Sequence, residues 1–199
     1  MKPACALFQI TWELEPPDGV LQHTIYTDGS AINAEVPAAC RAGWGLAMIG
    51  PGSNIVAAAA RGLLPTFTQS SGCAEIYAAA VALTMASPPI TIATDYEHLL
   101  EGWQMGPGFF THAGAKSGEA WKHFWRIVAD FGPEHITTRE VPARKPFLAV
   151  AQGIISFCDW LGNRKADELA KRGVMGHRSN QTWIATERDR IHKQYCIGK

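Results

Sequence analysis

The chain has 199 residues, of which 47% are hydrophobic and 18% are charged. This length suits one domain with a sizeable core and modest extensions, and the composition is that of a folded protein rather than a disordered one. Lysine and arginine together number 18, as do aspartate and glutamate, so the whole molecule exerts no long-range pull on a polyanion, and any affinity for nucleic acid must come from local patches.

The first part of the sequence predicts an antiparallel meander of three strands. The strand-like segments are residues 20–28, 39–49 and 54–64, and the turn Gly50-Pro51-Gly52 separates the second from the third. Apolar runs joined by short turns are typical of neighbouring antiparallel strands.

The second part alternates helices with two further strands. The helices are expected at residues 73–86, 97–103, 119–131 and 163–171, and the strands at residues 90–95 and 136–141. Ser71 and Gly72 stand where the first helix would be capped, and Pro88 and Pro89 would stop it. This order predicts an α/β fold with a mixed five-stranded sheet flanked by helices, in which two parallel strands join the three-strand meander.

One domain accounts for most of the chain. We expect it to cover residues 20–173, after an N-terminal extension of residues 1–19 and before a C-terminal tail of residues 174–199. A charged stretch in that tail, residues 186–193, has the composition of a short extra helix.

Carboxylates from distant segments are expected to meet at one edge of the sheet. Asp28 would end the first strand and Asp95 the fourth, and an open α/β sheet collects the ends of its parallel strands in one crevice. Glu75 lies in the first turn of the 73–86 helix. On the last helix Asn163 and Asp167 are four residues apart and share one face.

Such a cluster requires cations. Two like charges about 4 Å apart cost on the order of 4 kcal/mol near a protein surface. Carboxylates without histidine or cysteine nearby suit Mg²⁺ or Mn²⁺, and two such ions can activate a water on one side of a phosphodiester and stabilise the leaving oxygen on the other. The pattern therefore predicts phosphodiester hydrolysis with two metal ions.

Five short motifs, in order, carry a resemblance to a known family. They are Ile25-Tyr26-Thr27-Asp28-Gly29-Ser30, Gly43-Trp44-Gly45, Ala74-Glu75-Ile76-Tyr77-Ala78-Ala79, Ala93-Thr94-Asp95, and Gly162-Asn163 with Ala166-Asp167-Glu168-Leu169-Ala170. Each motif alone is weak, but together, in this order and on the expected elements, they are specific. Over residues 20–173 the chain resembles type 1 ribonuclease H, which implies a ribonuclease H-like sheet and endonucleolytic hydrolysis of the RNA strand of RNA–DNA hybrids.

The resemblance also implies a role for each matching position. The catalytic and metal-binding carboxylates would be Asp28, Glu75, Asp95 and Asp167, with Asp28 shared by both ions. The RNA strand, recognised by its 2′-hydroxyl groups, would contact Gly29, Ser30, Gly72 and Asn163. Ser70 would fall where the family binds a DNA phosphate.

The chain departs from the family at the loop before the last helix. There the family has a histidine that assists proton transfer or product release, and Arg144 aligns with it here. Arginine is protonated at neutral pH and cannot act as a general base, so turnover should suffer although metal-driven chemistry need not stop. The loop that follows, residues 145–161, is long and apolar enough to pack as its own small helix or lid.

The basic handle with which many family members grip the hybrid is also reduced. The corresponding segment, residues 106–118, contains Lys116 as its only lysine or arginine. We therefore expect weak binding of the hybrid unless a fused or partner domain supplies affinity, as in versions associated with reverse transcriptases. An origin in a retroelement fits this pattern.

Several alternatives stay open at this stage. A catalytically silent ribonuclease H-like module, serving as a nucleic-acid-binding or structural part of a larger assembly, agrees with Arg144 and with the neutral charge. An exonuclease or transposase fits less well. Such proteins tend to have Asp-x-Glu on the first strand or a glutamate as the last carboxylate, whereas this chain has Asp28-Gly29-Ser30 and Asp167. Asn163 could be a plain helix cap, and Gly43-Trp44-Gly45 is expected to reflect tight packing between meander strands. The stripe of Trp121, Phe124, Trp125 and Val128 is expected in the core.

The remaining features concern the environment of the protein. The five cysteines are scattered and lack the spacing of a zinc site, which favours a reducing intracellular compartment, cytoplasm or nucleus. No apolar run is long enough to cross a membrane, and the first residues do not have the pattern of a secretion signal. We expect a monomer.

Overall fold

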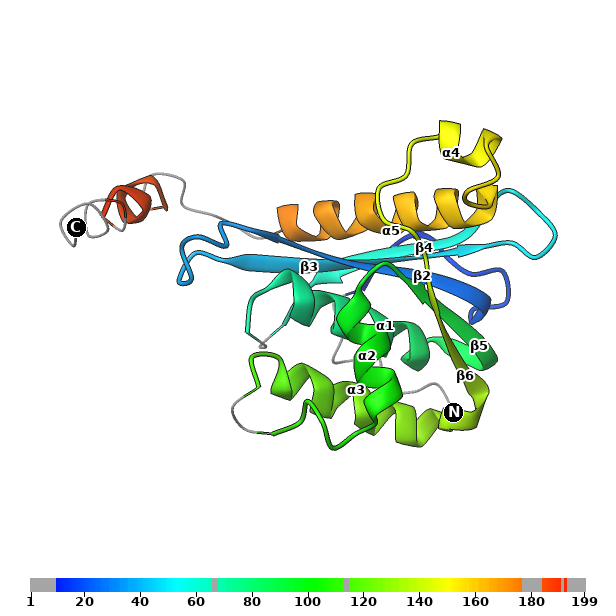
Figure 1. The fold of residues 1–199 in the computed structure, drawn as a ribbon, viewed down its shortest axis with the longest axis horizontal. Coiled ribbons are helices and arrows are strands. Elements are labelled where there is room, and N and C mark those ends of the chain that lie inside the picture. The colour runs from blue at the N-terminus through cyan, green and yellow to red at the C-terminus, as the bar shows by residue number, and fades with distance from the viewer. Residues whose placement is uncertain (1–9, 66–67, 113–114, 177–183, 191, 193–199) are drawn as a thin grey trace.

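A six-stranded mixed sheet separates two layers of helices in the computed structural model, which describes residues 10–65, 68–112, 115–176, 184–190 and 192 (Figure 1). The strand order is β1-β4-β3-β2-β5-β6, antiparallel from β1 to β2 and parallel from β2 to β6. The strands are β1 (Ile10–Leu14), β2 (Leu21–Ile32), β3 (Arg41–Ile49), β4 (Val56–Leu63), β5 (Ala86–Thr94) and β6 (Ile136–Glu140). The predicted meander with two added parallel strands is confirmed.

The helices lie on both faces of this sheet. On one face are α1 (Ser71–Thr84), α2 (Glu97–Met105) and α3 (Gly118–Phe131), and α5 (Phe157–Met175) crosses the other (Figure 1). A short helix, α4 (Leu148–Ala151), stands beside the start of α5, and a 3-10 turn, η2 (Pro133–His135), leads into β6. Among the described residues, no helix combines the length and apolar character needed to cross a membrane.

The sixth strand, β1, lies in the segment expected to be an extension. It pairs antiparallel with β4, with Ile10 opposite Gly62, and so forms one edge of the sheet. Five residues give too short a pattern to distinguish a strand from an irregular segment, and the partner strand lies more than 40 residues away in the chain. The prediction of five strands is thus wrong by one edge strand.

Helix α1 is buried on all sides, because it lies between the sheet and α3. Every residue from Cys73 to Leu83 is buried, and the alanines in this stretch favour helix and allow close approach. Its N-cap is Ser70, whose hydroxyl accepts a hydrogen bond from the backbone N–H of Cys73 at 3.1 Å, so the predicted cap was placed slightly too late.

The core stripe on α3 is confirmed. Trp121, Phe124 and Val128 are almost fully buried, and Trp125 is partly buried with its ring stacked on Trp103.

Helix α5 begins earlier than predicted and packs directly on β3. The hydroxyl of Ser156 caps it by accepting from the N–H of Asp159 at 3.0 Å. Gly45 has no room for a side chain, since a Cβ there would lie 2.4 Å from the carbonyl oxygen of Ala166. The tight packing around Gly43-Trp44-Gly45 is therefore against α5 and not between strands, which corrects the prediction.

Strand β5 also begins earlier than predicted. The chain enters this strand at Ala86, directly after α1 ends at Thr84, so Pro88 and Pro89 lie within the strand rather than in a helix stop. Regular pairing of β5 with β2 starts at Ile90, beyond both prolines, so neither removes a donor from that run of the ladder.

In the tail, residues 184–190 are helical and Ile184 packs on Val36 and Ala39. Arg188 donates to Asn33 at 2.8 Å and pairs with Glu35, which fixes this short helix beside the β2–β3 connection. The helix predicted at 186–193 is thus present and already includes residue 184, while residues 191 and 193 lie outside the described part of the chain.

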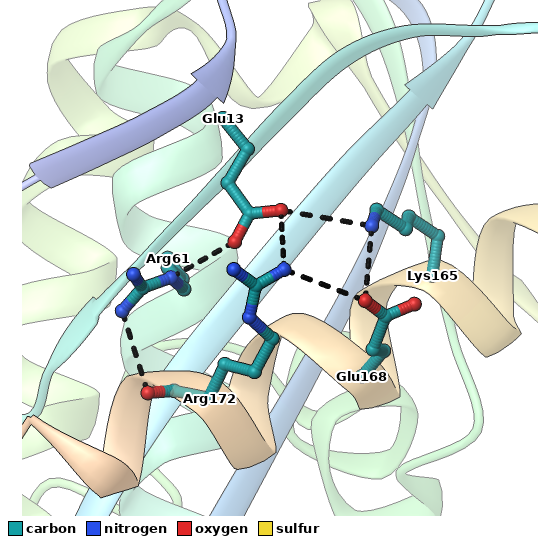
Figure 2. A network of polar contacts seen from close by, with 5 residues as sticks. All are labelled: Glu13, Arg61, Lys165, Glu168 and Arg172. Carbon is teal, nitrogen blue, oxygen red and sulfur yellow. Dashed lines mark hydrogen bonds and ion pairs between the residues drawn. The ribbon is translucent and has the colours of Figure 1, made fainter.

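An ion-pair network fastens β1 and β4 to the outer side of α5 (Figure 2). The carboxylate of Glu13 accepts from Arg61 at 3.0 Å and from Arg172 at 2.8 Å, and Lys165 lies 3.6 Å away. Glu168 pairs with Lys165 and Arg172 at 3.2 and 3.5 Å. The side chain of Glu13 is only 19% exposed, so one carboxylate from the unpredicted strand serves three cations from β4 and α5.

We expect Glu13→Gln to lower the free energy of unfolding by about 1 to 2 kcal/mol, because three partly exposed cations lose the carboxylate that they share. Denaturant unfolding measures the change, which should shrink at high salt since such pairs are screened. Glu15→Gln, at an exposed carboxylate two residues along the chain, is the control and should cost less than about 0.5 kcal/mol. Equal losses in the two variants would contradict the role given to Glu13.

Candidate active site

A cleft opens where β5 ends beside β2. The last parallel pair between them is Tyr26 with Ala93, whereas β2 continues to pair with β3 as far as Ile32. The edge of β2 beyond Tyr26 is therefore uncovered, and a cleft of about 760 Å³ forms there. Asp28 is an internal strand residue and does not end the strand as predicted, while Asp95 directly follows β5 as predicted.

Three carboxylates meet in this cleft. Asp28, Glu75 and Asp95 each offer an oxygen, and these oxygens all lie within 4.8 Å of one another. Glu75 is 6% exposed, and its Oε2 is buried without a hydrogen-bond partner among the described residues. The cluster contains carboxylates and no histidine or cysteine, and one of its buried oxygens has no donor among the described residues. Such a set of oxygen ligands fits a hard divalent cation.

The pKa values of Asp28 and Glu75 are both raised at this site. Burial, followed by the charges of Asp95 and Asp167, raises the pKa of Asp28 to about 6, although hydrogen bonds with Glu75 and the backbone of Gly29 oppose the shift. Burial and the charge of Asp28 hold the pKa of Glu75 well above its usual range. Without a cation, the folded protein therefore binds protons at this site that the unfolded chain has released.

The close approach of α1 to β2 creates the pair. A Cβ on Gly29 would lie 2.3 Å from the backbone nitrogen of Glu75 and 2.6 Å from the carbonyl oxygen of Ser71, so only glycine lets the first turn of α1 rest on the strand. This contact puts Glu75 next to Asp28. Gly29 and Ser30 also line the cleft.

Helix α5 brings Asn163 and Asp167 from the other face of the sheet. Asn163 is buried and its Nδ2 donates to Asp95 at 3.1 Å, while its Oδ1 has no partner among the described residues. Asp167 lines the same cleft but lies outside the group of three, with its side chain 46% exposed and paired with Lys171 at 2.6 Å. The structure thus gathers three of the expected carboxylates and leaves the fourth on the rim.

Two of the residues expected to contact the substrate lie outside the carboxylate cleft. Ser70 and Gly72 line a second cleft of about 800 Å³, together with Tyr96, His112 and Lys116. Ser71, between them in the chain, lines the carboxylate cleft. The first turn of α1 therefore separates the two clefts.

Arg144 lines the carboxylate cleft, as the alignment with the loop histidine requires, and adopts a left-handed backbone conformation with φ of 48°. Sequence reasoning missed several other residues of this cleft. They are Trp160, Arg164 and Lys171 on α5 and Lys145 before α4. A helix beginning at Phe157 would have revealed three of them, because Trp160, Arg164, Asp167 and Lys171 recur at the spacing of one helix face.

The sequence matches no protein-family model and no curated protein. Among solved structures, the fold is similar to the RNase H domain of PFV, at 24% identity over 79% of this chain and 97% of that one, with a TM-score of 0.54. RNase H1 from the halophilic archaeon Halobacterium salinarum NRC-1 aligns at 15% identity over 77% and 98%, with a TM-score of 0.52. LC9-RNase H1, a type 1 RNase H with the type 2 active-site motif, aligns at 14% identity over 80% and 76%, with a TM-score of 0.55. The chain has the ribonuclease H-like fold.

We expect the metal-free protein to lose stability as pH rises from about 4 to above 6. The folded-state pKa values of Asp28 and Glu75 are raised above the unfolded ones, so their contribution is fully present at low pH and disappears as both carboxyls ionise in the folded state. Mg²⁺ should restore stability at pH about 7.5 and have little effect at about 5, because it binds the ionised carboxylates.

Denaturant unfolding at both pH values, with EDTA or with Mg²⁺, measures this. Glu75→Gln is the matched control, since it keeps the shape of the side chain and removes one of the charges. It should flatten the dependence on pH and weaken the response to Mg²⁺. Stabilisation by Mg²⁺ that is equal at the two pH values would argue against a metal site at these carboxylates.

Proposed function

We propose that this chain is a metal-dependent endoribonuclease that hydrolyses the RNA strand of RNA–DNA hybrids. The observation that carries the proposal is the meeting of Asp28, Glu75 and Asp95 within 4.8 Å, with a buried oxygen of Glu75 left without a partner. The ribonuclease H-like fold, similar to solved RNase H domains over most of their length, supports the choice of reaction.

Two divalent ions, Mg²⁺ or Mn²⁺, would supply the activated water and the stabilisation of the leaving oxygen. Asp28, Glu75 and Asp95 would hold them at the centre, and Asp167 would contribute from the rim. Asn163 orients Asp95 through the hydrogen bond from its Nδ2. Protein groups of this kind fix the direction of a ligand, and their loss commonly costs 10- to 100-fold in metal affinity or activity, as an order of magnitude.

The two clefts suit the two strands of a hybrid. The RNA strand would lie in the carboxylate cleft against Gly29, Ser30 and Asn163, which line it, and would be recognised there by its 2′-hydroxyl groups. The DNA strand would lie across the second cleft, with a phosphate near Ser70. Gly72, which was expected against the RNA strand, lines this second cleft as well. The first turn of α1 would sit between the strands.

The absence of a loop histidine and the short 106–118 segment predict an enzyme with slow turnover and weak binding. A fused or partner domain would supply affinity, and a reducing intracellular compartment suits the unpaired Cys40, Cys73 and Cys158. The competing function is a silent module of the same fold that binds nucleic acid without cutting it, which Arg144 in the cleft favours.

Incubation with a hybrid labelled on either strand separates these functions. We expect cleavage of the RNA strand only, in Mg²⁺ or Mn²⁺, and a loss of more than about 100-fold in Asp28→Asn, which removes a central ligand. Double-stranded DNA and the same RNA without its partner are the substrate controls. If neither metal supports cleavage of the hybrid, the silent module is the correct reading.

We further expect Arg144→His to raise kcat more than it changes KM, because an imidazole can transfer a proton at neutral pH and a guanidinium cannot. Single-turnover and steady-state kinetics distinguish the two constants. Arg144→Gln, which removes the charge without adding a base, is the control. A rate in the histidine variant no higher than in the wild type would show that position 144 does not correspond to the loop histidine.

A further inference from the structure

The segment between β6 and α5, together with the first turns of α5, forms a basic and aromatic wall on the carboxylate cleft. This wall consists of Arg144, Lys145, Phe147, Trp160 and Arg164, all of which line the cleft. Ala149 and Ile155, in the same segment, are buried in a cluster with Tyr26 and Val141, so the segment is anchored to the sheet.

The aromatic part of the wall is held in place. The indole Nε1 of Trp160 donates to the carbonyl oxygen of Lys145 at 3.1 Å, and the guanidinium of Arg164 lies 5.0 Å from the centre of the Trp160 ring. Phe147 packs edge-on against Trp160 with ring centres 5.1 Å apart. Yet Phe147 is 57% exposed, so this supported ring presents a surface to solvent.

The positive charges of the wall are not neutralised by neighbouring carboxylates in the described part of the chain. Among the described residues, Arg144, Lys145 and Arg164 form no ion pair with a carboxylate, although four carboxylates line the same cleft. Cations that line a cleft without pairing to its carboxylates are available to an anionic ligand.

We propose that this wall binds the single-stranded nucleic acid that extends from the hybrid, with Lys145 and Arg164 on backbone phosphates and Phe147 stacked on an unpaired base. The inference rests on the proposed function, because the hybrid must enter the same cleft. Alternating cations and exposed rings are typical of single-strand binding, where each base stacked on an aromatic side chain adds to affinity. A base inside a duplex cannot reach such a ring, so the site selects hybrids with an unpaired flank.

The wall would take over the role of the reduced basic handle. It is fixed to α5, the helix that carries Asn163 and Asp167, so a strand held on Lys145 and Arg164 is positioned relative to the carboxylates. A protein partner would be the other occupant of the exposed Phe147, Leu148 and Ile154. The unpaired cations beside Phe147 favour a polyanion.

The test uses the full chain with Asp28→Asn, so that binding is measured without cleavage. Fluorescence anisotropy would compare a blunt RNA–DNA hybrid with the same hybrid carrying a single-stranded RNA extension. We expect the extension to tighten binding about tenfold, Phe147→Leu to remove the stacking part of this gain, and Phe147→Trp to retain it. Leucine preserves apolar packing and tryptophan preserves the stacking face, so the pair separates base stacking from loss of structure.

The cations are tested by salt dependence. Replacing Lys145 and Arg164 by glutamine should reduce the slope of log affinity against log salt by about 1.5 for the extended substrate, as two lost phosphate contacts require. The charge-matched control is glutamine at Lys122 and Arg126, which are exposed on α3 across the sheet and should leave the slope unchanged. Arg164→Lys, which keeps the charge, should retain most of the slope.

The outcomes separate this inference from the proposed function. If the wild-type chain cleaves hybrids but blunt and extended substrates bind equally, or if Phe147→Leu has no effect on the gain, the wall does not bind single strands and the proposed function stands. If the chain cleaves nothing, and the extension still tightens binding through Phe147 and the two cations, the site is real and the catalytic proposal fails.

Discussion

Mutual repulsion of carboxylates is the constraint on which the rest of this structure depends. Asp28, Glu75 and Asp95 are within 4.8 Å of one another, and Glu75 is buried with one oxygen unpaired. Left alone, these groups would separate or stay protonated. The fold resists separation, because α1 rests on β2 at Gly29, where a side chain would leave no room, and α5 holds Asp95 through Asn163. Two helices from opposite faces of the sheet therefore clamp one negative centre between them.

Stability and chemistry are supported from different sides of α5. One side of the helix carries Asn163 and Asp167 toward the cleft, and another side is fixed by Glu13 through Lys165 and Arg172 (Figure 2). A network remote from the carboxylates thus sets the position of the helix that orients one of them. The edge strand β1 accordingly belongs to the structural support of the site, although none of its residues lines the cleft.

The order of elements and the identity of the central carboxylates were predictable, because Asp28, Glu75 and Asp95 lie in motifs with local patterns that imply strand, helix start and strand end. Features that depend on contacts distant in sequence were not. Helix α5 continues through Gly162, which lies against the ring of Tyr26 with no room for a side chain, and β1 depends on pairing with β4. The separation of Ser70 and Gly72 from Ser71 into different clefts depends on which side of one helical turn each residue faces, which no periodicity in so short a segment reveals.

Under the proposed function, the pair between Asp167 and Lys171 makes the rim carboxylate a conditional ligand. At 2.6 Å the ammonium already satisfies Asp167, and exchange of an exposed pair of this kind involves no more than about 1 kcal/mol. A backbone phosphate entering the cleft is an equally good partner for Lys171, which lines it. Binding of the nucleic acid would thereby free the Asp167 carboxylate when the reaction needs it. The site would then become complete only when its substrate is bound.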